Sequence, residues 1–219
     1  MKKFLKFIYK KTLKRYFPPN NEIIDGILID ELKNCTKVLD LGCGPNSPLG
    51  RLKNDLNKNL YSVGVDIFEP YIEKNKMHSE CIQGNIFDIN FPENSFDCAL
   101  LLDVIEHFEK KDFIKFMPKL EKIAKKIIVM VPNGFINQDE YDKNIYQTHR
   151  SGWSLTEMEG LGFKCHGVSG LKFLRGELGI SRIKPRIIGE ILSTFTGPFI
   201  YNRPKIAFHL ICIKNNYDK

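Results

Sequence analysis

The sequence predicts an α/β fold in which helices cover both faces of one doubly wound, mostly parallel sheet. Residues 95–103 and 127–131 are almost unbroken apolar runs, typical of strands buried on both faces. Residues 38–41 are another such run and lead into the glycine turn 42–44, after which Ser47-Pro48 is suited to start a helix. Ligands in open α/β sheets bind at the carboxyl ends of strands, so the turn is predicted to be a cofactor site.

The remaining elements follow from hydrophobic spacing. Apolar residues at helical intervals predict helices over 22–33, 71–77 and 111–125, the last bent at Pro118. Ser154 and Glu157 form a capping box that opens a further helix, closed by Gly160 or Gly162. Shorter apolar runs predict strands over 61–66, 80–85, 163–168 and 206–213.

The residues around the turn indicate which cofactor it takes. A dinucleotide fingerprint needs a third glycine where this chain has Ser47. Asp40 would repel a pyrophosphate but tolerates a ligand with an ammonium and a sulfonium. Asp66 ends the next apolar run, near the roughly 20-residue offset at which an acidic side chain meets ribose hydroxyls. A cationic nucleoside is therefore expected.

Five segments, in this order, resemble the class I S-adenosylmethionine-dependent methyltransferases, particularly the small type 11 domains. They are Val-Leu-Asp-Leu-Gly-Cys-Gly (38–44), Val-Gly-Val-Asp (63–66), Gly-Asn-Ile-Phe-Asp (84–88), Phe-Pro-Glu-Asn-Ser-Phe-Asp (91–97) and Asp-Val-Ile-Glu-His (103–107). The resemblance runs from about Lys37 to Phe163. It implies a seven-stranded Rossmann-like methyltransferase fold, S-adenosylmethionine as cofactor and S-adenosylhomocysteine as product.

The resemblance also implies a set of cofactor-binding residues. Asn85 replaces a more frequent aspartate but still accepts a hydrogen bond from the adenine amino group through its carbonyl. Ile67 is expected to pack on the adenine, and the backbone N–H of Ile86 to meet a ring nitrogen. The full set is Asp40, Gly42, Cys43, Gly44, Asp66, Ile67, Asn85, Ile86, Leu102, Asp103 and His107.

The acceptor side is less defined by the sequence. His107 and His149 are candidate general bases, because the pKa of histidine lies near neutral pH. By resemblance, Tyr146, His149 and Trp153 in and after the long loop 135–150 are candidate substrate contacts. The alternatives are that His107 bonds to backbone at a helix start, that His149 is a loop hydrogen-bonder and that Trp153 is a packing residue.

Asn-Pro-Pro-Tyr and a Pro-Cys nucleophile, typical of two kinds of nucleobase methylation, are absent from the sequence. The leading expectation is methyl transfer to an oxygen or nitrogen of a small molecule. The alternatives are an RNA methyltransferase, a membrane-proximal lipid methyltransferase and a non-catalytic binding protein.

Length and charge set further bounds. The 219 residues suit one domain over 20–219, preceded by a basic amphipathic helix over 1–19. Residues 1–17 carry seven positive charges and no acid, which accounts for the net charge of +7. This helix is expected either to dock on an anionic membrane or RNA, or to pack over the cofactor site.

An insert at 169–205 is basic and apolar together, which favours an anionic partner with an apolar part or a homodimer interface. Scattered cysteines, with no Cys-x-x-Cys pair, predict a cytoplasmic chain with neither a metal site nor disulfides. The first residues lack a signal-peptide core.

Overall fold

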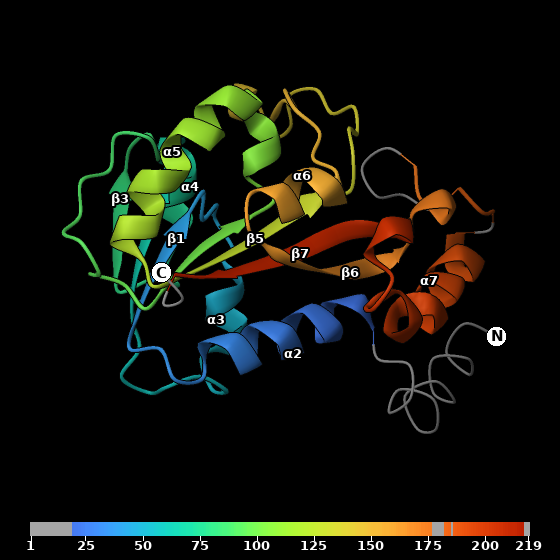
Figure 1. Ribbon diagram of the computed structural model, residues 1–219, viewed down its shortest axis with the longest axis horizontal. Helices are drawn as coiled ribbons and strands as arrows, with labels where there is room; N and C mark the ends of the chain where they lie inside the picture. The colour runs from blue at the N-terminus through green and yellow to red at the C-terminus, as the bar shows by residue number, and fades with distance from the viewer. Residues whose placement is uncertain (1–18, 177–181, 185, 217–219) are drawn as a thin grey trace.

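The computed structural model describes residues 19–176, 182–184 and 186–216. The helix predicted over 1–19 lies outside the described residues except for Pro19, and so do residues 177–181 and 185 of the insert. The described chain forms one seven-stranded sheet with helices on both faces (Figure 1). Among the described residues, no helix has the length and apolar character that spanning a membrane requires.

The strand order confirms the predicted doubly wound, mostly parallel sheet. The order is β3-β2-β1-β4-β5-β7-β6, and β7 is antiparallel to both of its neighbours, β5 and β6. Every other pair is parallel. The strands are β1 (Lys37–Leu41), β2 (Tyr61–Asp66), β3 (Glu80–Gln83), β4 (Cys98–Leu102), β5 (Lys126–Pro132), β6 (Lys164–Leu171) and β7 (Ala207–Asn215).

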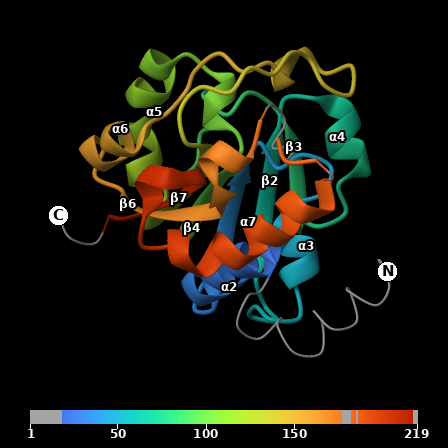
Figure 2. The same cartoon turned by 90° about the vertical axis from the view of Figure 1, so that its right-hand side faces the viewer.

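Helices α5 and α6 lie on one face of the sheet, and α2 and α3 lie on the other (Figure 1). Helix α7 packs on β6 and beside α2, at the end of the molecule that faces the viewer in Figure 2. The α-helices are α2 (Asn20–Leu32), α3 (Pro48–Leu52), α4 (Glu69–Lys74), α5 (Lys110–Ile123), α6 (Leu155–Gly160) and α7 (Arg186–Ile200). Short 3₁₀ helices are η2 (Ile105–His107), η3 (Ile145–Gln147), η4 (Lys172–Leu174) and η6 (Pro204–Ile206).

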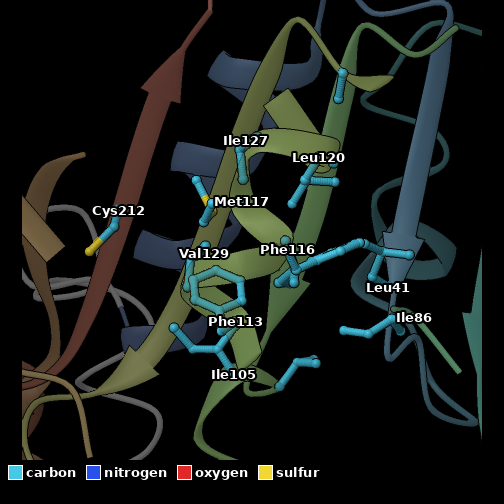
Figure 3. Close-up of a cluster of buried hydrophobic side chains, with 14 of the residues drawn as sticks. Leu41, Ile86, Ile105, Phe113, Phe116, Met117, Leu120, Ile127, Val129 and Cys212 are labelled. Atoms are coloured by element: carbon cyan, nitrogen blue, oxygen red, sulfur yellow. The ribbon is translucent and has the colours of Figure 1, made fainter. Parts of the chain in front are cut away.

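The apolar side chains form two buried clusters, one on each face. Successive residues of a strand point to opposite faces, so Ala99 and Leu101 pack under α5 while Cys98 and Leu100 pack over α2. On the first face, Phe113, Phe116, Met117 and Leu120 of α5 point toward the β5 side chains Ile127 and Val129 (Figure 3). This two-sided burial is why the strands read as continuous apolar runs.

Some boundaries differ from the sequence-based prediction. The helix predicted over 71–77 begins at Glu69 and ends at Lys74, because the Asn75 side chain accepts the N–H of Met77 and so turns the chain. The strand predicted over 95–103 begins at Cys98. Helix α5 continues through Pro118. The capping box of Ser154 and Glu157 is present at the start of α6.

Candidate active site

The glycine turn after β1 holds the carboxyl ends of β1 and β2 together. The backbone N–H groups of Gly42 and Cys43 donate to the carbonyl of Val65, at 2.8 and 3.1 Å. Gly42 and Gly44 have φ angles of +70° and +55°, in the left-handed region that favours glycine. A Cβ on Gly42 would lie 2.6 Å from Cγ2 of Val104. Only glycine therefore fits at position 42 without displacing its neighbour.

Asp66 closes the turn from the end of β2. Its carboxylate accepts the backbone N–H of Gly44 on one oxygen and that of Phe68 on the other, both at 2.9 Å. A carboxylate accepts several hydrogen bonds, so Asp66 is still able to accept a ligand hydroxyl. Burial raises the pKa of this carboxyl above its ordinary value, and the backbone N–H groups of Phe68, Gly44 and Ile67 oppose that shift. Asp66 is thus held in place before any ligand arrives.

A cavity of about 330 Å³ opens beside this turn. Four carboxylates line it against one guanidinium, that of Arg150, so the cavity carries negative charge. This donor set fits a cationic ligand such as S-adenosylmethionine, and Asp66 offers acceptors for ribose hydroxyls. The lining residues are Gly42, Asp66, Ile67, Asn85, Ile86, Phe87, Asp103, Val104, His107, Phe108, Glu109, Asp112, Asn144, Tyr146, Gln147 and Arg150.

Most residues predicted to bind the cofactor line this cavity. They are Gly42, Asp66, Ile67, Asn85, Ile86, Asp103 and His107. The side-chain amide oxygen of Asn85, Oδ1, already accepts the backbone N–H of Phe87 at 3.0 Å, which leaves one lone pair on this oxygen for a ligand.

The other predicted cofactor residues, Asp40, Cys43, Gly44 and Leu102, do not line the cavity. Asp40 is buried behind the turn, where it accepts the Ser47 hydroxyl at 2.6 Å and lies 3.3 Å from Nε2 of His78. Its position supports the turn and the start of α3.

A second cavity, of about 490 Å³, shares Asp103, His107 and Gln147 with the first. Most of the residues that line it have polar or titratable side chains. The lining residues are Asp103, Glu106, His107, Pro132, Ile136, Gln138, Tyr141, Gln147, His149, Phe208 and His209. An acceptor in this cavity would be separated from the cofactor only by the residues that both cavities share.

Asp103 stands between the two cavities in a strained conformation. Its φ is +57°, which is unfavourable for a residue other than glycine and is often found at functional sites. Its backbone N–H donates to the Met130 carbonyl at 2.9 Å and so fixes it at the end of β4. Although 48% of its side chain is accessible, the surrounding cleft raises the pKa of Asp103 to about 7.

His107 and His149 come together at the second cavity, with ring centroids 5.0 Å apart. Nδ1 of His107 lies 3.2 Å from the Thr148 carbonyl, and Nδ1 of His149 lies 2.7 Å from the Ile136 carbonyl. A carbonyl only accepts, so each Nδ1 carries the proton and each Nε2 presents a lone pair. Burial lowers the pKa of His107 to about 4 and that of His149 below its ordinary value, so both rings are neutral at neutral pH.

Glu106 links these two histidines. Its backbone carbonyl accepts the N–H groups of Arg150 and Ser151, at 2.8 and 3.0 Å, which ties the loop carrying His149 to η2. Its side chain is buried, and Oε2 has no hydrogen-bond partner. Burial raises the pKa of Glu106 well above its ordinary value, and the nearby Asp103 adds to the shift.

The candidate substrate residues are divided by the fold. His149 lines the second cavity, and Tyr146 lines the first. Trp153 lines neither: its side chain is 1% exposed, its Nε1–H donates to the Ile105 carbonyl, and its ring packs on Phe113. Trp153 is therefore a packing residue of the core and does not line the acceptor pocket.

Sequence reasoning missed His209, which lines the second cavity with Nε2 3.7 Å from Oδ1 of Asp103. Strand β7 is antiparallel to β5, and His209 pairs with Pro132 at the carboxyl end of β5. The first residues of β7 therefore lie at the edge of the sheet where the parallel strands have their carboxyl ends. Burial lowers the pKa of His209 to about 3. The signal was a histidine near the start of the last strand, which is informative only when the strand direction is known.

A third cavity, of about 560 Å³, adjoins the second through Ile136 and Phe208. It combines cationic and large apolar side chains from the insert and the loop after β5. The guanidinium of Arg175 lies 5.6 Å from the Phe208 ring centroid, and the Lys172 ammonium donates to the Asn133 carbonyl. The basic members are Lys172, Arg175, Arg182 and Lys205, and the apolar members are Phe135, Ile136, Phe173, Ile206 and Phe208.

Comparison with known proteins agrees with this geometry. Residues 39–127 match a family described as a methyltransferase domain. The uncharacterized protein MJ0638 of Methanocaldococcus jannaschii is 30% identical over 158 residues, which are 69% of this chain and 64% of that protein. The sterol 24-C-methyltransferase ERG6A of Gibberella zeae is 24% identical over 154 residues, which are 64% of this chain and 38% of that protein. The chain thus spans less than two thirds of the length of either relative.

Among solved structures, a SAM-dependent methyltransferase from Archaeoglobus fulgidus superposes with a TM-score of 0.58 and 19% identity, covering 97% of this chain and 99% of that one. That likeness is one of fold. The assignment rests on the domain match, and the fold and a cavity whose charge and glycine turn fit the cofactor agree with it: residues 39–127 form a methyltransferase domain of the kind that uses S-adenosylmethionine.

Proposed function

We propose that this chain transfers a methyl group from S-adenosylmethionine to an oxygen or nitrogen atom of a small-molecule acceptor held in the second cavity. The observation that carries the proposal is the shared wall of Asp103, His107 and Gln147 between the two cavities. An acceptor atom beside that wall would be close to a methyl group presented from the cofactor side.

When bound, S-adenosylmethionine supplies a methyl group on an activated sulfonium. The protein then contributes mainly by alignment and by exclusion of water. The carboxylates of the first cavity stabilise the positive charge of the cofactor. The acceptor lone pair forms the bond to carbon as the carbon–sulfur bond breaks. The acceptor proton leaves to the polar lining of the second cavity, to which His107 and His149 belong; each ring has Nδ1 on a backbone carbonyl, which leaves the lone pair on Nε2.

The third cavity supports an anionic acceptor with an apolar part. Its cationic side chains would bind a carboxylate or phosphate, while Phe135 and Phe173, which are 59% and 66% exposed, would cover an apolar body. Because this cavity adjoins the second, one extended molecule would place its anionic end in the third cavity and its reacting atom in the second.

The similarity to sterol C-methyltransferases suggests a different acceptor, a carbon atom of a sterol. The second cavity favours a heteroatom instead, because titratable groups make up much of its lining and a sterol would leave them without partners. The similarity covers 38% of ERG6A, so we keep carbon methylation as an outcome of the test.

The test is an acceptor screen with S-adenosylmethionine labelled in the methyl group. Hydroxylated aromatic acids, hydroxylated phosphates, amines, sterols, phospholipid vesicles and RNA are compared, with Gly42→Val as the control that blocks the cofactor cavity. We expect label in an anionic small molecule and none with the control. Label in sterol carbon, lipid or RNA alone would contradict the proposed acceptor class.

A further inference from the structure

Three side chains of the second cavity converge on one point. Glu106 and His107 come from η2, and His149 comes from the loop before α6. One potential ligand atom from each lies within 4.8 Å of the other two. Ligand atoms bound to a common ion at about 2.0–2.2 Å are separated by about 3–4 Å. A small inward movement of the three side chains would therefore bring them to coordination distance.

The Glu106 carboxylate gives an independent indication that a ligand is missing. The residue is 2% exposed, yet Oε2 has no hydrogen-bond partner. A buried carboxylate oxygen without a partner is destabilising, and such groups in native proteins usually have a ligand or a function. A cation between Glu106 and the two histidines would supply the partner that this oxygen lacks.

The hydrogen bonds of the two histidines orient them as ligands. Nδ1–H of His107 is donated to the Thr148 carbonyl and Nδ1–H of His149 to the Ile136 carbonyl. Metal-binding histidines are typically held in this way, because the second nitrogen fixes the ring and its tautomer. Both Nε2 lone pairs are then free to coordinate an ion.

We propose that Glu106, His107 and His149 bind one divalent metal ion in the wall of the acceptor cavity. This inference deepens the proposed function and rests on it for the identity of that cavity. Two imidazoles and one carboxylate favour a transition ion such as Mn²⁺, Co²⁺ or Zn²⁺ over Ca²⁺. Three protein ligands leave positions open for an acceptor, which points to a hydroxyl oxygen as the methylated atom.

The ion gives the histidines a different role from that of general bases. A bound ion would lower the pKa of a hydroxyl that it held, so the acceptor oxygen would give its proton to water before it attacked the methyl carbon. The carbon–sulfur bond would break in the same step, with its electron pair left on sulfur. This proposal departs from the expectation, drawn from the scattered cysteines, that the chain has no metal site, because its ligands are histidine and glutamate side chains instead of thiolates.

The experiment uses the full chain freed of metal with a chelator. Co²⁺ is titrated by visible absorption and by calorimetry into the wild type, Glu106→Gln and His149→Gln. The matched control is His166→Gln, since His166 stacks on Tyr201 and lines none of the three cavities. Circular dichroism establishes that each variant is folded, and two ligand variants guard against failure of either one.

We expect the wild type and His166→Gln to bind one Co²⁺ per chain with ligand-field bands, and each ligand variant to bind at least tenfold more weakly. Absence of saturable binding, or equal affinity in all four proteins, would overturn the metal site. S-adenosylhomocysteine is titrated into the same metal-free samples. Binding of S-adenosylhomocysteine without binding of Co²⁺ would remove the metal site alone, whereas loss of S-adenosylhomocysteine binding would count against the proposed function.

Discussion

Asp66 is the residue on which we expect cofactor recognition to depend most. Its carboxylate accepts the backbone N–H groups of Gly44 and Phe68 and is expected to accept a ribose hydroxyl as well. A hydrogen bond to a charged group contributes about 1.5–3 kcal/mol. Asp66→Asn is therefore expected to weaken S-adenosylhomocysteine binding by at least tenfold, measured by calorimetry.

Asp88→Asn is the control for that variant, because Asp88 is exposed and lies outside all three cavities. The melting temperature of Asp66→Asn is recorded as well, since the substitution also disturbs a backbone hydrogen bond. Equal affinity in the two variants would mean that Asp66 does not contact the ribose.

A second prediction concerns Asp97 and the free energy of unfolding. It accepts the N–H groups of Thr36 and Lys37, at 2.8 and 3.1 Å, and pairs with Lys125 at 2.8 Å. Partial burial opposes ionisation, but Lys125 and the Thr36 and Lys37 groups lower the pKa of Asp97 below its ordinary value. Its stabilising effect is then complete above the unfolded pKa of about 3.9 and is lost as the pH falls toward the folded pKa.

Asp97→Asn is thus expected to lower the free energy of unfolding at pH 7 by about 1–3 kcal/mol. The difference from the wild type should narrow at pH 3, because the wild-type carboxylate loses part of its advantage there. Urea denaturation of the wild type and of Asp97→Asn at both pH values measures this difference in the free energy of unfolding. A difference of the same size at pH 3 and pH 7 would show that ionisation of Asp97 is not the source.

Helix α2 offers a stabilising substitution. Gly26 is exposed in the middle of this helix, and a Cβ there would meet no atom within 4 Å. Gly26→Ala should raise the free energy of unfolding by about 0.5–1 kcal/mol, because alanine has less backbone freedom to lose.

Gly64→Ala in β2 is the contrast, since its Cβ would lie 2.4 Å from the buried His78 ring. Gly64→Ala should lower the free energy of unfolding. Urea denaturation of both variants measures the two changes, and a lower free energy of unfolding for Gly26→Ala would contradict the helical assignment of that position.

The elements themselves were largely predictable from the sequence. Strands β1, β4 and β5 are continuous apolar runs because both faces are covered, and the turn at Gly42 and Asp66 follows directly from local spacing. The capping box at Ser154 is equally local.

The acceptor side depends on contacts between distant residues, which local patterns do not reveal. His149 reaches His107 because the backbone of 150–151 bonds to Glu106, and His209 reaches Asp103 only because β7 runs antiparallel. For Trp153 the sequence left two roles open, a substrate contact and a packing residue, because a tryptophan suits a core as well as a pocket. Its contact with Phe113 supports the packing role.

The three cavities form one continuous series across the molecule, with shared residues at each boundary. If the third cavity binds an anionic end of the acceptor, Arg182 and Lys205 contribute binding that is equal in the ground and transition states. Arg182→Ala and Lys205→Ala should then raise the KM for the acceptor several-fold with little change in kcat.

Lys58→Ala is the matched control, since Lys58 is exposed and lines none of the three cavities. Steady-state kinetics with the acceptor found in the screen measures all three. A fall in kcat with an unchanged KM would place these cations in another role.

Binding of S-adenosylmethionine in the first cavity can be measured by calorimetric titration of the wild type with S-adenosylmethionine and with S-adenosylhomocysteine. We expect one site of micromolar affinity for each, absent in Gly42→Val. Ligand at a hundred times its dissociation constant should raise the melting temperature by roughly 5–10 °C, because it adds about 2.7 kcal/mol of stability. No saturable binding by a folded wild type, or unchanged binding by Gly42→Val, would contradict the account.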